Sequence, residues 1–200
     1  MIYVVVALAA EARPLITHFQ LTKVDELEPL SIYRQPDVAL IVSGVGKEAM
    51  AASVVALAKA IPPADNTVWV NVGVAGHRNH EIGTAVLAHQ VKDEETGAIH
   101  PLSPPADLNL EIGEVRTVMH VETRYESKAL YEMEAAAFCE RAVELTSAEL
   151  IQVLKIVSDN RRSGTLCVSA RQVQGLIEDN LPKVDLLVSS LHRQARRLSQ

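Results

Sequence analysis

The sequence predicts an α/β fold built on a mainly parallel or mixed central sheet. Apolar segments typical of strands alternate with segments of helical periodicity along the chain, which is the pattern that such folds require. The 200 residues are enough for one large domain. No internal repeat, low-complexity run or long linker divides them. We therefore expect a single domain over residues 1–200.

Two strand–helix pairs open the chain. Met1–Ala7 is apolar and rich in β-branched residues, which predicts a strand buried on both faces. Ala10–Phe19 has helical spacing of its apolar residues. Val38–Val42 predicts a second buried strand, and the glycine-containing turn Ser43–Lys47 follows it. The alanine-rich segment Glu48–Ala60 is expected to form a helix that ends before two prolines.

The middle of the chain is less regular. Thr67–Val72 predicts a strand, and the glycines of Gly73–Gly76 indicate a turn after it. Thr84–Val91 and Val115–Val121 are expected to form two further strands. Between them, Lys92–Gly113 holds three prolines and lacks periodicity, so we expect a long surface loop.

In the last third of the chain, expected helices and strands alternate again. We expect a helix over Leu130–Leu145, a strand over Leu150–Val157, and closing helices over Ser169–Leu198 that are interrupted near Pro182. In α/β folds, ligands bind where strands end and loops begin. Small or polar residues follow four of the expected strands, at Ala7–Glu11, Ser43–Lys47, Asn71–Gly76 and Ser158–Asp159.

Composition excludes several classes of protein. Acidic residues outnumber basic ones, 25 to 19, which argues against a nucleic acid partner. The longest apolar run, Val4–Ala10, is far shorter than the roughly 20 residues of a membrane span, and no charged segment of a signal peptide precedes it. Cys139 and Cys167, expected in a helix and a strand, lack the spacing of a disulfide scaffold or a zinc ribbon. We therefore expect a cytoplasmic protein without a membrane partner.

Two motifs suggest a cofactor or a metal, but neither is complete. The turn from Gly44 to Ala49 fits the G-x-G-x-x-A form of the dinucleotide fingerprint. The acidic residue that should close the next strand is absent, since that strand ends in Val70-Asn71-Val72. A tight turn, or a loop that faces a ribose or an anion, explains the glycines instead. His77 and His80 form an H-x-x-H pair without a third ligand. We expect no cofactor and no metal.

Three carboxylates lie where a site would be expected. Glu11 follows the first strand, Glu134 lies in an otherwise apolar helix start, and Asp159 ends a late strand. Each also has an ordinary structural explanation, because acids favour the first turn of a helix, solvent-facing positions and turns.

Six short segments, in the same order, resemble the purine nucleoside phosphorylase and methylthioadenosine/S-adenosylhomocysteine nucleosidase superfamily. Ser43–Lys47 is similar to its S-G-[IM]-G-K turn and Asn71–Gly76 to its N-T-G-S-A-G segment. The other four segments that match the superfamily in order are Ala7–Glu11, Ile82–Val86, Glu132–Ala135 and Ser158–Asp159. The resemblance covers most of the chain. It implies a mixed twisted sheet, partly barrel-like and flanked by helices.

The resemblance also implies roles for individual residues. Asp159 corresponds to the general acid that protonates the departing base, and Glu11 to the carboxylate that activates water. Glu134 corresponds to the clamp on the ribose hydroxyls, with Met133 packed on the sugar. The remaining residues that it places around the substrate are Glu132, Ser158, Gly76, Val45, Val74 and Lys155; of these, Ser158 lines the base pocket and Val45 lies near the 5′ group.

Several positions depart from the superfamily. Val74 and Lys155 stand where the nucleosidases have a serine and an arginine that help to hold water. Asn71 stands where the phosphorylases bind phosphate with an arginine. Any phosphate site would have to use other cations, from among Arg13, Lys47, Lys155, Arg161 and Arg162. The segment from Val91 to Tyr131 is short for the superfamily, so the base is not defined.

We therefore expect hydrolysis of a purine-type nucleoside, with no cofactor. Two alternatives stay open: a phosphorylase that uses phosphate, and a nucleoside-binding homologue that has lost catalysis. We also expect a homodimer or a larger homo-oligomer, because the apolar helix Glu48–Ala60 offers a packing face.

Overall fold

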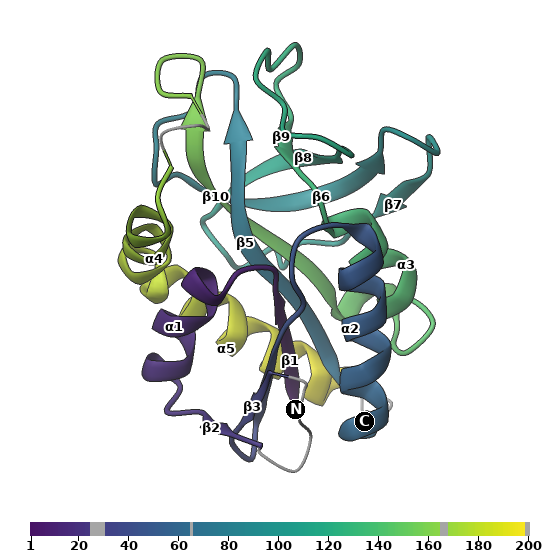
Figure 1. Ribbon diagram of the computed structural model, residues 1–200. Helices are drawn as coiled ribbons and strands as arrows, with labels where there is room; N and C mark the ends of the chain where they lie inside the picture. Colours follow the sequence, from purple (N-terminus) through teal and green to yellow (C-terminus); the bar gives the residue numbers. More distant parts are fainter. Residues whose placement is uncertain (25–30, 65, 165–167, 199–200) are drawn as a thin grey trace.

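A mixed β-sheet forms the centre of the computed structural model, which describes residues 1–24, 31–64, 66–164 and 168–198 (Figure 1). The ten strands within these residues are β1 (Ile2–Val6), β2 (Thr22–Lys23), β3 (Ile32–Arg34), β4 (Val38–Val42), β5 (Val68–His77), β6 (Ala85–Asp93), β7 (Ile99–Pro101), β8 (Glu111–Thr117), β9 (Leu130–Glu132) and β10 (Ile151–Asn160). The α-helices are α1 (Ala9–His18), α2 (Lys47–Ala60), α3 (Ala135–Ala142), α4 (Ala170–Asp179) and α5 (Leu181–Leu198).

Part of the sheet closes on itself. The strand order is β10-β6-β8-β9-β5-β1-β4-β3-β2, with β7 beside β6, and β10 also pairs with β5. The second pairing of β10 joins β5, β9, β8, β6 and β10 into a closed ring, while β1, β4, β3 and β2 extend it as an open sheet. Both β1 and β10 run parallel to β5, so their carboxyl ends meet at the same edge.

Two helical layers cover the two faces of the open sheet (Figure 1). In β1, Tyr3 and Val5 pack in one hydrophobic cluster with side chains of α2 and α3. The alternate residues Ile2, Val4 and Val6 pack in a second cluster with α1, α4 and α5. Because neighbouring side chains of a strand point to opposite faces, burial on both sides explains the unbroken apolar run.

The structure confirms most of the expected elements at the N-terminal end. The strand expected over Val38–Val42 has the same bounds as β4, and β1, α1 and α2 begin and end within a few residues of their expected limits. The short strands β2 and β3 were not predicted, because they carry too few residues to show a period of two.

The expectations that were wrong all concern the ring. Gly73–Gly76 is not a turn but the end of β5, and β10 runs on past Val157 to Asn160, because the two strands pair with each other over this length. The expected loop over residues 92–113 contains β7 and the start of β8, which ends at Thr117 rather than at Val121.

The helix expected over residues 130–145 was wrong at its start. Its first three residues form β9, and the helix begins only at Ala135. The closing segment is two helices that meet at Asn180, as the proline at position 182 indicated. Cys139 lies buried in α3, whereas the strand expected at Cys167 falls outside the described residues.

Candidate active site

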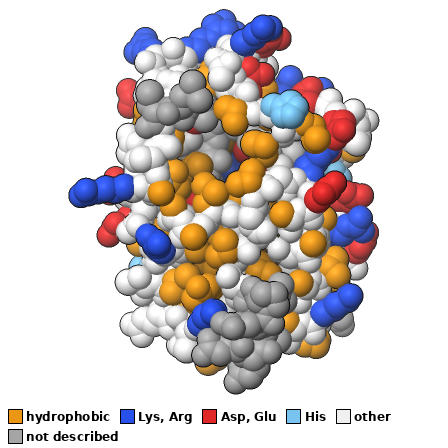
Figure 2. Space-filling model, in the orientation of Figure 1, with side chains coloured by type: hydrophobic (Ala, Val, Ile, Leu, Met, Phe, Trp, Pro, Cys, Tyr) orange, Lys and Arg blue, Asp and Glu red, His pale blue; other side chains and the backbone are white. Residues whose placement is uncertain are grey.

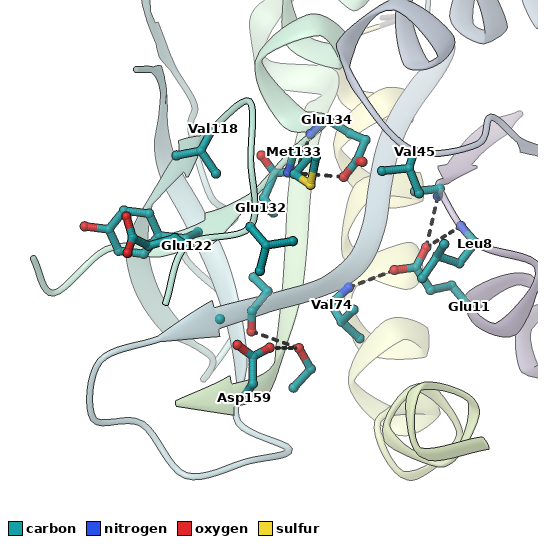
Figure 3. Close-up of a pocket in the computed structure, with 16 residues that line it drawn as sticks. Leu8, Glu11, Val45, Val74, Val118, Glu122, Glu132, Met133, Glu134 and Asp159 are labelled. Atoms are coloured by element: carbon teal, nitrogen blue, oxygen red, sulfur yellow. Dashed lines mark hydrogen bonds between the residues drawn. The ribbon is translucent and has the colours of Figure 1, made fainter. Parts of the chain in front are cut away.

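A pocket opens at the carboxyl ends of β1, β5 and β10 and is a cavity of about 210 Å³ (Figure 3). Nine of the ten site residues expected from the sequence line it; the tenth, Lys155, lies beneath it. The residues that line the pocket are Ala7, Leu8, Glu11, Val45, Val74, Ala75, Gly76, Val118, Val121, Glu122, Tyr131, Glu132, Met133, Glu134, Ser158 and Asp159.

Glu11 is held by backbone N–H groups from two elements. It lies in the first turn of α1, where its Oε2 accepts hydrogen bonds from the N–H groups of Ala7 and Leu8, each at 2.9 Å. Its Oε1 accepts one from the N–H of Val74 in β5, also at 2.9 Å. Burial raises the pKa of Glu11, and the nearby Lys155 ammonium and these three N–H groups oppose that shift. Val74 thus contributes its backbone to the site, which its apolar side chain does not prevent.

Gly73 makes room for this arrangement. A Cβ at position 73 would lie 2.9 Å from Oε1 of Glu11 and 3.3 Å from Nζ of Lys155. The carboxylate and the ammonium therefore approach the β5 backbone from its side-chain face. This close approach explains why a glycine interrupts the strand here, where the sequence suggested a turn.

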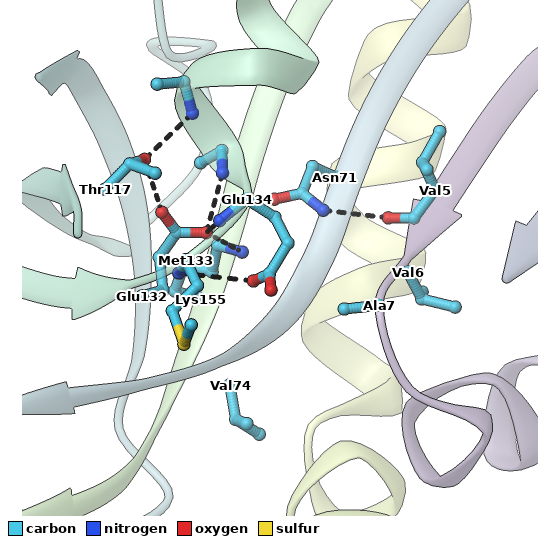
Figure 4. A network of polar contacts seen from close by, with 12 residues as sticks. Val5, Val6, Ala7, Asn71, Val74, Thr117, Glu132, Met133, Glu134 and Lys155 are labelled. Atoms are coloured by element: carbon cyan, nitrogen blue, oxygen red, sulfur yellow. Dashed lines mark hydrogen bonds and ion pairs between the residues drawn. The ribbon is translucent and has the colours of Figure 1, made fainter. Parts of the chain in front are cut away.

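Glu132 organises the turn before α3 (Figure 4). Its Oε1 accepts a hydrogen bond from the Thr117 hydroxyl at 2.6 Å. Its Oε2 accepts the N–H groups of Glu134 and Ala135, at 3.1 and 2.8 Å, and lies 2.9 Å from Nζ of Lys155. Glu132 is 6% exposed. Through these contacts Glu132 orders the turn that carries Glu134, and it also lines the pocket, as expected of a residue of the site.

Lys155 carries the positive charge of a buried cluster of ionisable groups. Lys155 is 2% exposed and lies on β10, beneath the pocket floor. Burial alone would lower the pKa of Lys155, but the carboxylates of Glu132, Glu134 and Glu11 raise it further, so the net direction is upward. Lys155 is therefore a permanent cation that balances part of the charge of three carboxylates.

Glu134 faces the turn that precedes α2. Its Oε1 accepts the N–H of Gly46 at 2.7 Å, and its Oε2 lies 3.3 Å from the N–H of Met133. Burial and the neighbouring Glu132 raise the pKa of Glu134 to about 7, against the opposing effects of Lys155 and the Gly46 N–H. Glu134 is thus close to half-protonated at neutral pH.

Asp159 lies on the opposite side of the pocket, where the pairing of β10 with β5 is irregular. The register shifts between Val157 and Asp159, and this bulge turns the side chain of Asp159 into the cavity (Figure 3). The Ser158 hydroxyl donates a hydrogen bond to Oδ1 of Asp159 at 2.5 Å, and the Tyr125 hydroxyl donates one to Oδ2. A Cβ at position 76 would lie 2.7 Å from Oδ2, so Gly76 gives Asp159 the space it occupies.

Sequence analysis missed Tyr125, Glu122, Val118 and Tyr131. Tyr125 contacts Asp159, and the other three line the pocket. They come from the segment between β8 and β9 and from β9 itself, where no periodicity or motif marks them. Only the short length of this segment, already noted, pointed to an unusual pocket wall.

Among the residues that the structure describes, no lysine or arginine lines the pocket. Lys47 lies 3.0 Å from Asp93 and also contacts Glu95, and Lys155 pairs with Glu132. Arg13 belongs to a groove beside α1 and α4, away from this pocket. The other two candidates are also elsewhere, since neither Arg161 nor Arg162 is a lining residue.

The two histidines of the H-x-x-H pair are structural. His77 ends β5 and is buried; its Nε2 donates to the Lys128 carbonyl at 2.8 Å, and its Nδ1 accepts the N–H groups of Asn79 and His80. Within the described residues, no group of three or more histidine, cysteine and acidic side chains could hold a metal ion. In the same residues, no helix is both long enough and apolar enough to span a bilayer.

Solved structures of nucleosidases share this arrangement of strands and helices. The 5′-methylthioadenosine nucleosidase of Arabidopsis thaliana matches with a TM-score of 0.76 and 22% sequence identity, over 94% of this chain and 95% of its own. An MTA/SAH nucleosidase matches with a TM-score of 0.76 and 19% identity, over 94% and 95% of the two chains. This chain has the nucleosidase fold.

The nucleosidase fold extends to enzymes with other substrates. The futalosine hydrolase of Helicobacter pylori matches with a TM-score of 0.67 and 13% identity, over 91% of this chain and 97% of its own. The sequence itself matches no protein-family model and no curated protein. The expectation of an α/β fold with a mixed, partly barrel-like sheet is therefore confirmed, whereas the roles of single residues rest on the geometry of the pocket.

The buried charge cluster predicts a large effect of removing its cation. Lys155→Met should lower the free energy of unfolding by about 3–5 kcal/mol, because it leaves buried carboxylates without their counter-ion. Lys155→Arg keeps the charge and should lose much less. Chemical denaturation measures both, with Lys128→Met, at an exposed side chain, as the control. Equal stability of wild type and Lys155→Met would contradict the cluster.

The raised pKa of Glu134 predicts a pH-dependent stability. Because its pKa is higher in the folded protein, its contribution to stability is full below about pH 4.5 and is lost as the pH rises through about 7. Glu134→Gln cannot ionise, so its stability relative to wild type should increase by up to about 3 kcal/mol between about pH 5 and pH 8. Denaturation curves at several pH values measure this difference. Glu149→Gln, at an exposed carboxylate, should show no such trend.

Proposed function

We propose that this protein hydrolyses the N-glycosidic bond of a purine-type nucleoside. The observation that carries the proposal is the placement of Asp159, Glu134 and Glu11 at three sides of one pocket (Figure 3). A nucleoside has three parts that need different chemistry: a base that leaves, a sugar that must be held, and an anomeric carbon that water attacks. One carboxyl group is available for each part.

The proposed reaction uses each carboxyl group once. Asp159 donates a proton to the base while the bond between the base and C1′ breaks, and the bonding electron pair leaves with the base. Glu134, when ionised, accepts hydrogen bonds from the ribose hydroxyls. Glu11 accepts a proton from the water whose oxygen bonds to C1′. One water is consumed, and the free base and the sugar are the products.

The charge of the pocket favours water over phosphate as the nucleophile. Of the lining residues within the described part of the chain, five are acidic, namely Glu11, Glu122, Glu132, Glu134 and Asp159, and none is basic. A phosphate ion would be repelled by these carboxylates and would find no cation among the lining residues. The cations that sequence analysis offered for phosphate are paired with acids or lie elsewhere. A phosphorylase is therefore the weaker alternative.

The same charge favours one class of nucleoside. A 5′-phosphate is disfavoured for the reason that inorganic phosphate is. Leu8, Val45 and Val74 provide apolar surface on the side of the pocket that holds Glu11 (Figure 3). We therefore propose an uncharged nucleoside with a small apolar 5′ substituent. 5′-Methylthioadenosine has this chemistry and is the first compound to test.

A nucleoside-binding protein without catalysis is the second candidate. Both oxygens of Glu11 already accept backbone hydrogen bonds, and Val74 offers no hydroxyl to a water molecule. Tight binding of nucleosides without release of base over long incubation would favour this candidate.

We predict release of base from 5′-methylthioadenosine without phosphate, with little stimulation when phosphate is added. Chromatography of the products separates free base, sugar and sugar phosphate. Asp159→Asn should reduce the turnover number by about 10²-fold or more, because it removes the proton donor but keeps the shape. Strict dependence on phosphate, with a ribose 1-phosphate product, would instead show a phosphorylase.

We also propose a cytoplasmic homodimer. A groove on α2 is lined by Ala51, Ala52, Val55 and Ala56 together with two cations, Lys59 and Arg141, and Val55 is 37% exposed. Hydrophobic side chains cover the middle of the face that shows α1 and α2, while charged ones gather mostly at its edges (Figure 2). Such a patch is typical of a contact between subunits. The unpaired, buried Cys139 supports a reducing compartment.

The α2 face predicts a measurable change in assembly. Sedimentation at micromolar concentration should give twice the mass of the chain. Val55→Arg places a charge in the proposed interface and should give a folded monomer. A wild-type monomer would contradict the proposal.

A further inference from the structure

Tyr125 contacts the carboxylate that we propose as the general acid. Its hydroxyl donates a hydrogen bond to Oδ2 of Asp159, while Ser158 donates one to Oδ1. Tyr125 is only 1% exposed, and it is not among the residues that line the pocket. It therefore reaches Asp159 from behind the pocket wall and does not contact substrate.

The chain holds Tyr125 in an unfavourable backbone conformation. Its φ is 47°, in the left-handed region that L-residues other than glycine, asparagine and aspartate rarely adopt. Oε1 of Glu122 accepts the N–H groups of Arg124 and Tyr125, at 2.5 and 3.3 Å. The Arg161 side chain donates to the Arg124 carbonyl at 2.9 Å. These bonds fix the turn that directs the tyrosine inward.

The segment after Tyr125 is anchored as well. The Lys128 carbonyl accepts a hydrogen bond from His77, and the Glu126 carbonyl accepts one from Arg78 at 3.2 Å. The Ser127 hydroxyl and the Tyr131 hydroxyl lie 2.8 Å apart. With contacts on both sides, the position of Tyr125 is determined by the surrounding structure.

Gly76 completes the arrangement. A Cβ at this position would lie 2.6 Å from Cε1 of Tyr125 and 2.7 Å from Oδ2 of Asp159. Only a residue without a side chain lets both groups meet over β5. A strained turn, anchored flanks and a missing Cβ therefore all serve one hydroxyl–carboxylate contact.

We propose that Tyr125 is a positioning residue for the general acid, which stabilises the carboxylate that remains after Asp159 has given its proton to the base. This inference rests on the proposed function. Donation from a hydroxyl favours the ionised form of a carboxyl group. In a buried site, such a preorganised donor lowers the energy of a charge that develops during the reaction.

The same hydrogen bond has an opposite effect before the reaction. A hydroxyl that donates to a carboxyl group favours its charged form, and the charged form cannot act as an acid. The Tyr125 hydroxyl therefore increases the rate of the reaction but narrows the pH range over which the enzyme is active. Removing its hydroxyl should slow the reaction at low pH and extend activity to higher pH.

Other ionisable groups surround this contact and must stay unchanged in the test. The titratable groups that line the pocket besides Asp159 are Glu11, Glu122, Glu132, Glu134 and Tyr131. The charged or titratable groups bonded to the backbone around Tyr125 are His77, Arg78, Glu122 and Arg161. Lys155 lies beneath the pocket. All of them are retained in Tyr125→Phe.

The test compares pH profiles of kcat/KM for 5′-methylthioadenosine in wild type and Tyr125→Phe, from about pH 5 to about pH 10. The rate on the low-pH side should fall about tenfold, and the alkaline limb should move up by about one pH unit, which is the effect expected of one hydrogen bond to a charged group. Tyr33→Phe, on β3, removes a hydroxyl outside the pocket and should leave the profile unchanged.

A second pair of variants tests the contact without altering either partner. Glu122→Ala removes the acceptor that holds the turn, so it should move the alkaline limb in the same direction as Tyr125→Phe. Glu122→Gln removes the same charge but keeps an oxygen acceptor, so comparing the two variants separates the effect of the turn from that of the Glu122 charge. The alkaline limb of Glu122→Ala should lie above that of Glu122→Gln. These two Glu122 variants also test the proposal if Tyr125→Phe does not fold.

Several outcomes would overturn the inference. A loss of rate by the same factor at every pH would show that Tyr125 only fills space, and an unmoved or lowered alkaline limb would contradict its effect on Asp159. If wild type binds adenine but cleaves no nucleoside, the proposed function fails and the inference is then tested on binding alone. Calorimetry must show that the upper pH limit of adenine affinity rises in Tyr125→Phe; a fixed limit would refute the inference.

Discussion

The Lys155 ammonium is the charge on which the site depends. It lies beneath the pocket, where it pairs with Glu132 and compensates the charges of Glu11 and Glu134. Without it, three carboxyl groups would share a buried volume at a large electrostatic cost. Glu132, held in this way, caps the start of α3 and so places Glu134 against Gly46. The position of the proposed ribose clamp therefore follows from one buried ion pair.

The strand ring brings these groups together from distant parts of the chain. Because β5 lies between β1 and β10, the N–H of Val74 reaches Glu11 on one side while Gly76 admits Asp159 on the other. A single strand thus fixes the separation between the proposed acid and the proposed base. Gly73 and Gly76 leave room for side chains from α1, from β10 and from the segment before β9, while β5 itself stays continuous.

Sequence alone predicted the open sheet better than the ring. The bounds of β4 and nearly all of β1 follow from burial on both faces, which leaves an unbroken apolar run. In the ring, Gly73 and Gly76 suggested a turn, although they are needed for side chains that approach from elsewhere. Glu132 carried no sign of its partner Lys155, and Tyr125 belongs to no recognisable motif. Contacts between residues far apart in sequence leave no local periodicity to read.

The double pairing of β10 has a consequence for biosynthesis. This strand supplies Asp159 and Lys155, and it closes the ring by bonding to β5 and β6 together. Until it emerges from the ribosome, both of those strands present unpaired backbone edges, which are prone to join other chains. When β10 pairs with β5 and β6, it covers these two exposed edges and completes the pocket at the same time.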